Sequence, residues 1–256
     1  MPHIIAIHSF RRGLGKSNLI ANLAVLLAAH DQKVGIVDMD LRAPSQPILF
    51  GLDDTDIKFT LNDFLWGNAE IEQTVVQLAP PLNGKTSGQI YLVPASTRPA
   101  DITRILRGDY YVHLLHDGFD RLVKTFNLDI VLVDTHAGLG EETLLAFGIS
   151  DTMTILLGHD QRDFQGAAVS VDVVRELEIP RVNIIVNQTS PNLNFSQVKQ
   201  EVAETYGCDV LGVLPYSEDL AALASRQIFV KRYPEHPFTQ TLEQIAVKLS
   251  NSQRCG

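Results

Sequence analysis

The sequence predicts an α/β protein in which a doubly wound, mostly parallel sheet carries helices on both faces. Three observations support this fold class. Short, nearly continuous apolar runs recur along the chain, amphipathic segments separate them, and apolar residues make up 45% of 256 residues, enough for a large core. Apolar strands that alternate with amphipathic helices are typical of a parallel sheet that is covered on both sides.

The elements are expected in alternation along a single domain that spans residues 1–249, followed by a polar tail at 250–256. Residues 61–67 have the pattern of a short helix, and residues 80–84 that of a turn. The expected strands are 4–7, 34–37, 90–93, 130–133, 154–157, 182–186 and 210–213. The expected helices are 17–29, 110–126, 164–177, 195–206 and 239–249.

Charge and cysteine content exclude several classes of protein. A net charge of -9 disfavours non-specific binding to nucleic acids and to anionic membranes, because both need a positive field. Cys208 and Cys255 belong to no CxxC pair, which argues against iron–sulfur and structural zinc sites and fits a reducing compartment. The first residues enter a strand pattern without an export signal, so we expect a soluble, cytoplasmic protein.

The segment between the first expected strand and the first expected helix has the composition of a phosphate-binding loop. Gly13 and Gly15 allow the backbone to turn so that its N–H groups face phosphate oxygens. Lys16 would reach the β- and γ-phosphates, and Ser17 would bind Mg²⁺. The predicted ligand is therefore ATP or ADP with Mg²⁺. The nucleotide contacts are predicted at Arg12, Gly13, Leu14, Gly15, Lys16, Ser17 and Asn18.

The loop departs from the usual pattern G-x-x-x-x-G-K-[ST], because Phe10 occupies the first glycine position. A simple turn between a strand and a helix is the alternative reading of the same residues. The loop resembles the deviant Walker A motif of the MinD/ParA family of P-loop ATPases, K-G-G-x-G-K-[ST]. Arg11 then stands in place of the signature lysine, and Arg12 in place of a glycine.

Three further segments resemble MinD/ParA motifs in the expected order, so the resemblance covers nearly the whole chain. Residues 34–45 resemble the strand that ends in D-x-D with the first switch, and residues 130–138 resemble the Walker B strand with the second switch. Residues 182–188 and 211–215 resemble the part of the family fold that binds the base. The family implies an ATPase that forms a nucleotide-sandwich dimer.

The resemblance also implies roles for aspartates that follow the strands. Carboxylates at the carboxyl ends of parallel strands lie where α/β sheets bind ligands. Asp134 would hold Mg²⁺, and Asp40 would position the attacking water or complete the metal shell. Asp38 is implied by the resemblance as a further residue of the metal site. A lone aspartate at a strand end is more commonly a turn former or helix cap.

Three further side chains receive roles from the family. Asn187 is expected to recognise adenine through its amide, and Pro215 to line the base pocket. Arg11 is a candidate catalytic residue that reaches the partner's phosphates as a trans arginine finger, because arginine suits phosphate geometry. The competing interpretation is a solvated loop arginine that contacts the phosphate of its own chain. Lys16 and Asp40 complete the predicted catalytic set.

The predicted function is a weak ATPase that acts as an ATP-dependent homodimer and positions or regulates a cellular assembly through a protein partner or cargo adaptor. One alternative is a nucleotide-binding module with little or no hydrolysis, and a second is a maturation or amide-forming enzyme. The 239–249 helix carries one cation, Lys248, so membrane binding is disfavoured. Lys231 and Arg232 form the best short candidate for a DNA contact.

Overall fold

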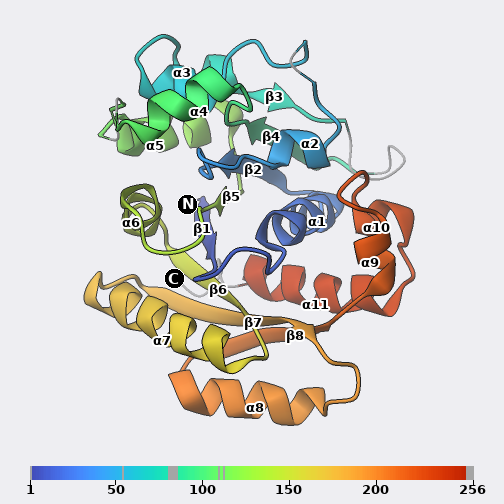
Figure 1. The fold of residues 1–256 in the computed structure, drawn as a ribbon. Coiled ribbons are helices and arrows are strands. Elements are labelled where there is room, and N and C mark those ends of the chain that lie inside the picture. The colour runs from blue at the N-terminus through green and yellow to red at the C-terminus, as the bar shows by residue number, and fades with distance from the viewer. Residues whose placement is uncertain (1, 54, 80–85, 109, 112, 252–256) are drawn as a thin grey trace.

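The structure is a computed structural model that describes residues 2–53, 55–79, 86–108, 110–111 and 113–251. Eight strands in this part of the chain form one sheet in the order β3-β4-β2-β5-β1-β6-β7-β8. The pairing of β3 with β4 is antiparallel, and the other pairings are parallel, which confirms the predicted fold class (Figure 1). The strands are β1 His3–His8, β2 Lys33–Asp38, β3 Val76–Gln77, β4 Gln89–Val93, β5 Ile130–Asp134, β6 Thr152–Gly158, β7 Arg181–Thr189 and β8 Asp209–Pro215.

Helices connect most successive strands and cover both faces of the sheet. In Figure 1, α1 and α11 lie on one face, and α6 and α7 on the other. The helices are α1 Lys16–Ala29, α2 Gln46–Leu49, α3 Leu61–Leu65, α4 Pro99–Leu106, α5 Leu114–Phe126, α6 Glu141–Gly148, α7 Gln161–Glu176, α8 Phe195–Tyr206, α9 Glu218–Ala222, α10 Phe229–Arg232 and α11 Pro237–Asn251, with a 3₁₀ turn at Ile71–Thr74.

The alternation of side chains along the strands builds two separate cores. Ile5 and Ile7 of β1 join the core beneath α1 and α11, whereas Ala6 joins the core on the opposite face. Nearly all of α1 is buried, because it lies between the sheet and α11. This burial holds the first turn of α1 at the carboxyl end of β1, where the predicted phosphate loop lies.

The structure differs from the sequence-based expectation mainly in short elements. The pattern did not predict β3, which contains two residues, nor the four- and five-residue helices α2, α9 and α10. The last helix continues to Asn251, two residues into the predicted tail. The predicted turn at 80–84 lies outside the described residues. Within the described ranges, we find no helix with the length and apolar character needed to cross a bilayer.

Gly88 packs so closely on the end of α1 that alanine should not fit there. A Cβ atom at this position would lie 1.9 Å from the backbone oxygen of Ala28. We expect Gly88→Ala to lower the free energy of unfolding by about 2 kcal/mol, because either β4 or α1 must move. Urea titration measures the loss. Gly148→Ala is the control, since a Cβ atom there has no neighbour within 4 Å, and equal losses in both variants would contradict the prediction.

Candidate functional site

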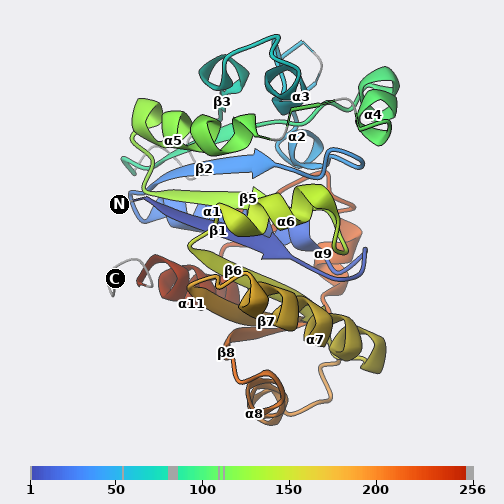
Figure 2. The same cartoon turned by 90° about the vertical axis from the view of Figure 1, so that its left-hand side faces the viewer.

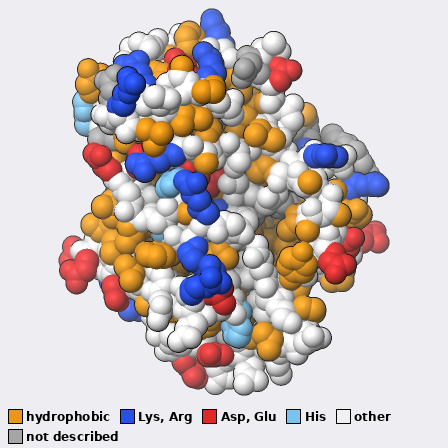
Figure 3. Space-filling view, in the orientation of Figure 1, with side chains coloured by type: hydrophobic (Ala, Val, Ile, Leu, Met, Phe, Trp, Pro, Cys, Tyr) orange, Lys and Arg blue, Asp and Glu red, His pale blue; other side chains and the backbone are white. Residues whose placement is uncertain are grey.

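The loops after β1, β2 and β5 meet at one edge of the sheet, because β1 is flanked by β5 and β5 is flanked by β2. Figure 2 shows that these strands end on the same side of the molecule. Figure 3 views this side and shows Lys, Arg and His side chains gathered along the middle of the surface. The carboxyl edge of a parallel sheet is the usual place for a ligand, and here it carries positive charge.

The phosphate loop connects β1 to the first turn of α1. Gly13 and Gly15 have φ angles of +85° and +83°, a left-handed conformation that favours glycine. Gly15 caps α1, and Lys16 is its first residue, with only 8% of its surface exposed. The first N–H groups of a helix have no partner within the helix and attract anions. The loop therefore has the conformation that the predicted phosphate site requires.

Two side chains at the end of β7 hold the loop in place. The amide nitrogen of buried Asn187 donates to the carbonyl oxygen of Leu14 at 2.8 Å, and that of exposed Gln188 donates to Gly13 at 2.9 Å. Sequence reasoning assigned Asn187 to adenine and overlooked this contact with the loop. Leu14 takes one of the two N–H donors of this amide, so the second N–H and the amide oxygen of Asn187 are left for the predicted adenine contact.

The two amides allow a matched test. We expect Asn187→Ala to weaken ATP binding about tenfold, because the loop loses a buried hydrogen bond worth roughly 1 to 1.5 kcal/mol. Gln188→Ala should have a smaller effect, since water can replace an exposed hydrogen bond. Fluorescent-nucleotide titration compares the two variants. A larger loss of ATP affinity in Gln188→Ala than in Asn187→Ala would show that burial does not determine how much each hydrogen bond contributes to ATP binding.

Asn187, one of the two residues predicted to bind the base, lines a small cavity beside α1. Gly15, Asn18 and Asn187 line it, together with Leu214, the residue before Pro215. The Asn18 amide also donates to the hydroxyl of Ser225 at 3.3 Å. Pro215 itself does not line this cavity. It ends β8 and pairs with Thr189 of β7, so its predicted contact with the base remains a prediction.

Asp134, at the end of β5, has the surroundings of a cation ligand. Its Oδ2 atom accepts a hydrogen bond from the Gln46 amide at 2.8 Å, and the Ser17 hydroxyl also donates to this carboxylate. The buried Oδ1 atom has no hydrogen-bond partner among the described residues. Burial raises the pKa of Asp134, and the charge of Lys16 opposes the rise.

These groups fit Mg²⁺, which prefers oxygen ligands and is often held by one carboxylate and a hydroxyl beside a phosphate. The Oδ1 atom of Asp134 and the hydroxyl of Ser17 would hold it. When bound, the ion would neutralise charge on the phosphates. Both residues were predicted from the sequence, and the structure brings them into direct contact.

Asp38, predicted as a metal-site residue, is the last residue of β2, and its carboxylate holds the loop that follows. Its Oδ1 atom accepts from the backbone N–H of Asp40 at 3.2 Å, and its Oδ2 atom accepts from Ser45 and Gln46 at 3.2 and 3.1 Å. Asp38 is paired with Asp134 across β2 and β5. Burial and then the Asp134 carboxylate raise the pKa of Asp38 well above its ordinary value.

Gln46 is a site residue that sequence reasoning missed. It is fully buried, and its amide nitrogen donates both to Asp134 and to the backbone oxygen of Ser17, the latter at 3.2 Å. Gln46 thus connects the loop after β2 to the phosphate loop. A glutamine in a polar loop is usually exposed, so the sequence did not suggest a buried role for Gln46. The one feature that could have indicated it was its position between the predicted first switch and Pro47, a residue that favours a helix start.

Arg11 points away from the phosphate loop, toward the start of α7. Its guanidinium forms an ion pair with Asp160 at 3.0 Å and a second with Asp163, which is 3% exposed. The structure therefore shows an intrachain contact that neither interpretation of Arg11 anticipated. A trans arginine finger remains a prediction, and it requires both ion pairs to break.

Phe10 also contacts α7. A Cβ atom on Gly166 would lie 2.5 Å from the Phe10 ring, so the ring packs on this glycine. A side chain larger than glycine could add bulk where phosphate approaches the backbone. The structure instead directs the Phe10 ring toward α7. The departure at the first glycine position therefore does not by itself argue against hydrolysis.

Arg12, His136 and Asp40 form a continuous chain of hydrogen bonds across three loops. Arg12 Nη2 lies 3.0 Å from His136 Nε2, and His136 Nδ1 lies 2.6 Å from Asp40 Oδ1. The same Asp40 oxygen accepts from the backbone N–H of Ala43 at 3.1 Å. Nearby, Arg42 of the loop after β2 donates to Glu142 of α6 at 3.1 Å. Both switch segments are therefore tied to their neighbours.

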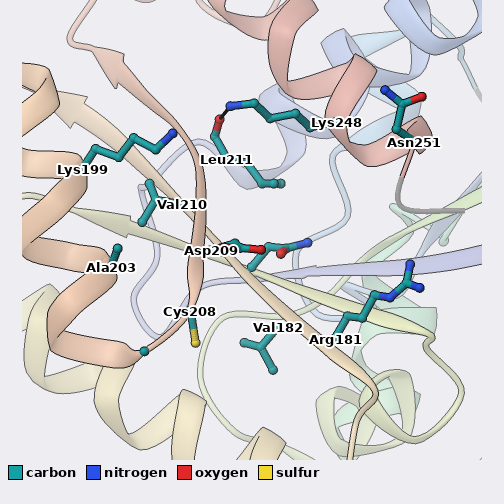
Figure 4. A pocket seen from close by; sticks show the side chains of 12 residues that line it. Arg181, Val182, Lys199, Ala203, Cys208, Asp209, Val210, Leu211, Lys248 and Asn251 are labelled. Atoms are coloured by element: carbon teal, nitrogen blue, oxygen red, sulfur yellow. Dashed lines mark hydrogen bonds between the residues drawn. The ribbon is translucent and has the colours of Figure 1, made fainter. Parts of the chain in front are cut away.

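A separate groove of about 1050 Å³ lies at the opposite end of the strands from the phosphate loop (Figure 4). Arg181 and Asp209, the first residues of β7 and β8, line it, so it lies at the amino ends of the strands. Lys248 of α11 reaches over it and donates to the backbone oxygen of Leu211 at 2.6 Å. The groove is remote from the phosphate loop and is not part of the nucleotide site.

Comparisons with known proteins identify the family of this chain. A family model described as "ParA: NUBPL iron-transfer P-loop NTPase" matches residues 1–250. An uncharacterized ATP-binding protein of Methanocaldococcus jannaschii is 27% identical over 250 residues, which cover 97% of this chain and 88% of that protein. The antiactivator FleN of Pseudomonas aeruginosa is 24% identical, over 97% of this chain and 86% of FleN.

A solved structure shows the same fold. The septum site-determining protein MinD from Pyrococcus horikoshii, complexed with Mg-ADP, superimposes with a TM-score of 0.78. The two sequences are 21% identical, and the match covers 97% of this chain and 96% of that one. The resemblance predicted from the motifs is confirmed.

Proposed function

Because the chain belongs to the ParA (NUBPL iron-transfer) family of P-loop NTPases, we propose that it is a weak, Mg²⁺-dependent ATPase that acts as a nucleotide-switched homodimer. It would position or regulate a cellular assembly through a protein partner. One observation carries the proposal. The phosphate loop is connected to the loop after β2 by Gln46 and to the loop after β5 by the Arg12–His136 contact. A phosphate bound in the loop can therefore change both surfaces.

The relatives support regulation of other proteins. FleN is described as an antiactivator, so at least one protein of this kind acts on a partner. The cytoplasm, where ATP is available, is the proposed location. The apolar side of α11 is buried against α1 and β8, which leaves this face unavailable to lipids. We therefore propose a protein partner and not a membrane.

The family description includes iron transfer, and the cysteines bear on that alternative. The thiolate is the form that binds metal. Burial raises the pKa of the Cys208 thiol, and the only other cysteine in this sequence is Cys255. This arrangement favours a protein cargo over an iron–sulfur cluster, and likewise offers little support for a maturation enzyme.

The oligomeric state of the protein in the presence of each nucleotide tests the proposal. We expect size exclusion with light scattering to find a dimer in Mg-ATP and a monomer in Mg-ADP. Lys16→Ala should remain monomeric in both, whereas Lys124→Ala, an exposed lysine on α5 with 77% of its side chain accessible, should behave as wild type. The same state of association in ATP, in ADP and without nucleotide would contradict the switch.

A module with little hydrolysis is the second candidate function. The observation that favours it is Asp40, whose Oδ1 atom is engaged by His136 and Ala43 and so is not free to bind water. Measured ATP affinity together with turnover at the background rate would select this candidate. Turnover above background that requires Mg²⁺ would select the ATPase.

A further inference from the structure

The contact among Arg12, His136 and Asp40 determines which ring nitrogen of His136 carries the proton. The guanidinium of Arg12 has only donors, so the His136 Nε2 atom, 3.0 Å away, must accept. The Nδ1 atom, 2.6 Å from Asp40 Oδ1, then donates to the carboxylate. This is the arrangement in which a carboxylate orients an imidazole and leaves a lone pair on Nε2.

The position of this lone pair matters because Arg12 belongs to the phosphate loop itself. Arg12 directly precedes Gly13, and His136 follows Asp134 by two residues. Nε2 therefore faces the guanidinium of a residue of the loop that would hold the γ-phosphate. The His136 side chain is 13% exposed and the Asp40 side chain 14% exposed, so the ring and the carboxylate are held in a largely enclosed position.

We propose that His136 orients the water that attacks the γ-phosphate, that Asp40 fixes the imidazole in position, and that Arg12 occupies the place of this water until phosphate draws the guanidinium away. The proposal rests on the proposed ATPase function. It adds His136 to the residues that contact the reacting groups and makes Asp40 a positioning residue that acts through the imidazole ring.

Phosphate is a stronger partner for Arg12 than a neutral imidazole is. Arginine binds phosphate oxygens through two parallel, charge-assisted hydrogen bonds, which are stronger than the single bond to Nε2. Movement of Arg12 onto the γ-phosphate therefore frees the His136 lone pair when ATP is bound. ADP lacks this phosphate, so Arg12 stays on His136 and the position of the water stays blocked.

The reaction balances without further components. The water oxygen forms a bond to the γ-phosphorus, and the bond from that phosphorus to the bridging oxygen breaks, with its electron pair leaving on ADP. His136 Nε2 accepts a hydrogen bond from the water during the attack, and the water proton ends on the released phosphate. The dyad contributes orientation, which is a major source of catalysis in phosphoryl transfer.

The variants separate water orientation from a structural contact. We expect His136→Ala to lower kcat on the order of 100-fold while ATP affinity changes less than about twofold. Arg12→Ala should weaken ATP binding and leave ADP binding unchanged. His116→Ala, an exposed histidine of α5, is the matched control. If His136→Ala does not fold by thermal melting, His136→Gln, which keeps hydrogen-bonding groups, replaces it.

A spectroscopic readout tests the exchange without turnover. The ¹⁵N resonance of His136 Nε2, measured at pH 8, should shift when Mg-ADP with beryllium fluoride replaces Mg-ADP, and Arg12→Ala should produce this shift without nucleotide. An unchanged resonance in both experiments, or normal kcat in His136→Ala, would overturn the proposal while leaving the ATPase intact. If wild-type protein shows no Mg²⁺-dependent turnover, the proposed ATPase fails as well, and the two failures are distinguishable.

Discussion

Lys16→Ala is expected to reduce ATP affinity by about 100-fold or more and to reduce turnover to background. Lys16 is largely buried at the first position of α1, where its charge acts on the carboxylate of Asp134 and on the imidazole of His8. Truncation of a buried charge that pairs with a ligand costs about 2 to 5 kcal/mol, and each 1.4 kcal/mol changes affinity about tenfold. Isothermal titration with Mg-ATP measures the loss.

Lys124→Ala again serves as the control, because Lys124 is exposed and forms a surface pair with Asp120 at 3.6 Å. Thermal melting without nucleotide should show that both variants are folded. Near wild-type affinity in a folded Lys16→Ala protein would mean that the backbone of the loop alone binds the phosphates. The assignment of Lys16 would then be wrong.

His8 should make the protein strongly sensitive to acid. This residue ends β1, is fully buried, and stacks edge-on against Phe147 at 5.1 Å. Burial, followed by the charge of Lys16, lowers the pKa of His8 from 6.5 to about 3. Below pH 6.5, His8 therefore binds a proton in the unfolded chain but stays neutral in the folded protein. Stability from neutral His8 is complete above pH 6.5 and is lost as the pH falls toward 3.

The free energy of unfolding should fall by about 1.4 kcal/mol for each pH unit, which amounts to roughly 2 to 3 kcal/mol between pH 6.5 and 4.5. Urea unfolding of wild type and of His8→Leu over this range gives the effect of His8 as the difference in slope, because the other titrating groups are common to both. Parallel pH profiles for wild type and His8→Leu would show that the imidazole is protonated within the fold.

Long, regular elements could be predicted from the sequence because their apolar pattern is repeated. The run that became β7 and the amphipathic segment that became α8 Phe195–Tyr206 were both recognised. Two-residue β3 has too few side chains to show a period, and α2 and α10 are single turns. Such short elements depend on tertiary packing, which no local pattern encodes.

The candidate site likewise contains residues that a local motif predicts and residues that only tertiary packing brings together. The phosphate loop, Ser17 and Asp134 were predicted because a motif places them next to one another in the fold. The partners of Arg11 at the start of α7 follow it by about 150 residues, and the contact of Asn187 runs from β7 to Leu14 in the loop after β1. His8 and Gln46 are buried polar residues whose environments exist only after folding. Their roles could not be derived from spacing along the chain.

Both edge strands of the sheet, β3 and β8, are poorly suited to pairing with a further strand. At one margin, β3 offers two residues for pairing. At the other, the register of β8 shifts between its pairings with Ile184 and Ile185, and Lys248 occupies the backbone oxygen of Leu211 at that shift. A register irregularity in an edge strand and a helix that covers the edge both hinder unwanted strand addition. For the proposed dimer, which would form and separate repeatedly, edge strands of this kind would hinder irreversible polymerisation and leave reversible contacts to the loops.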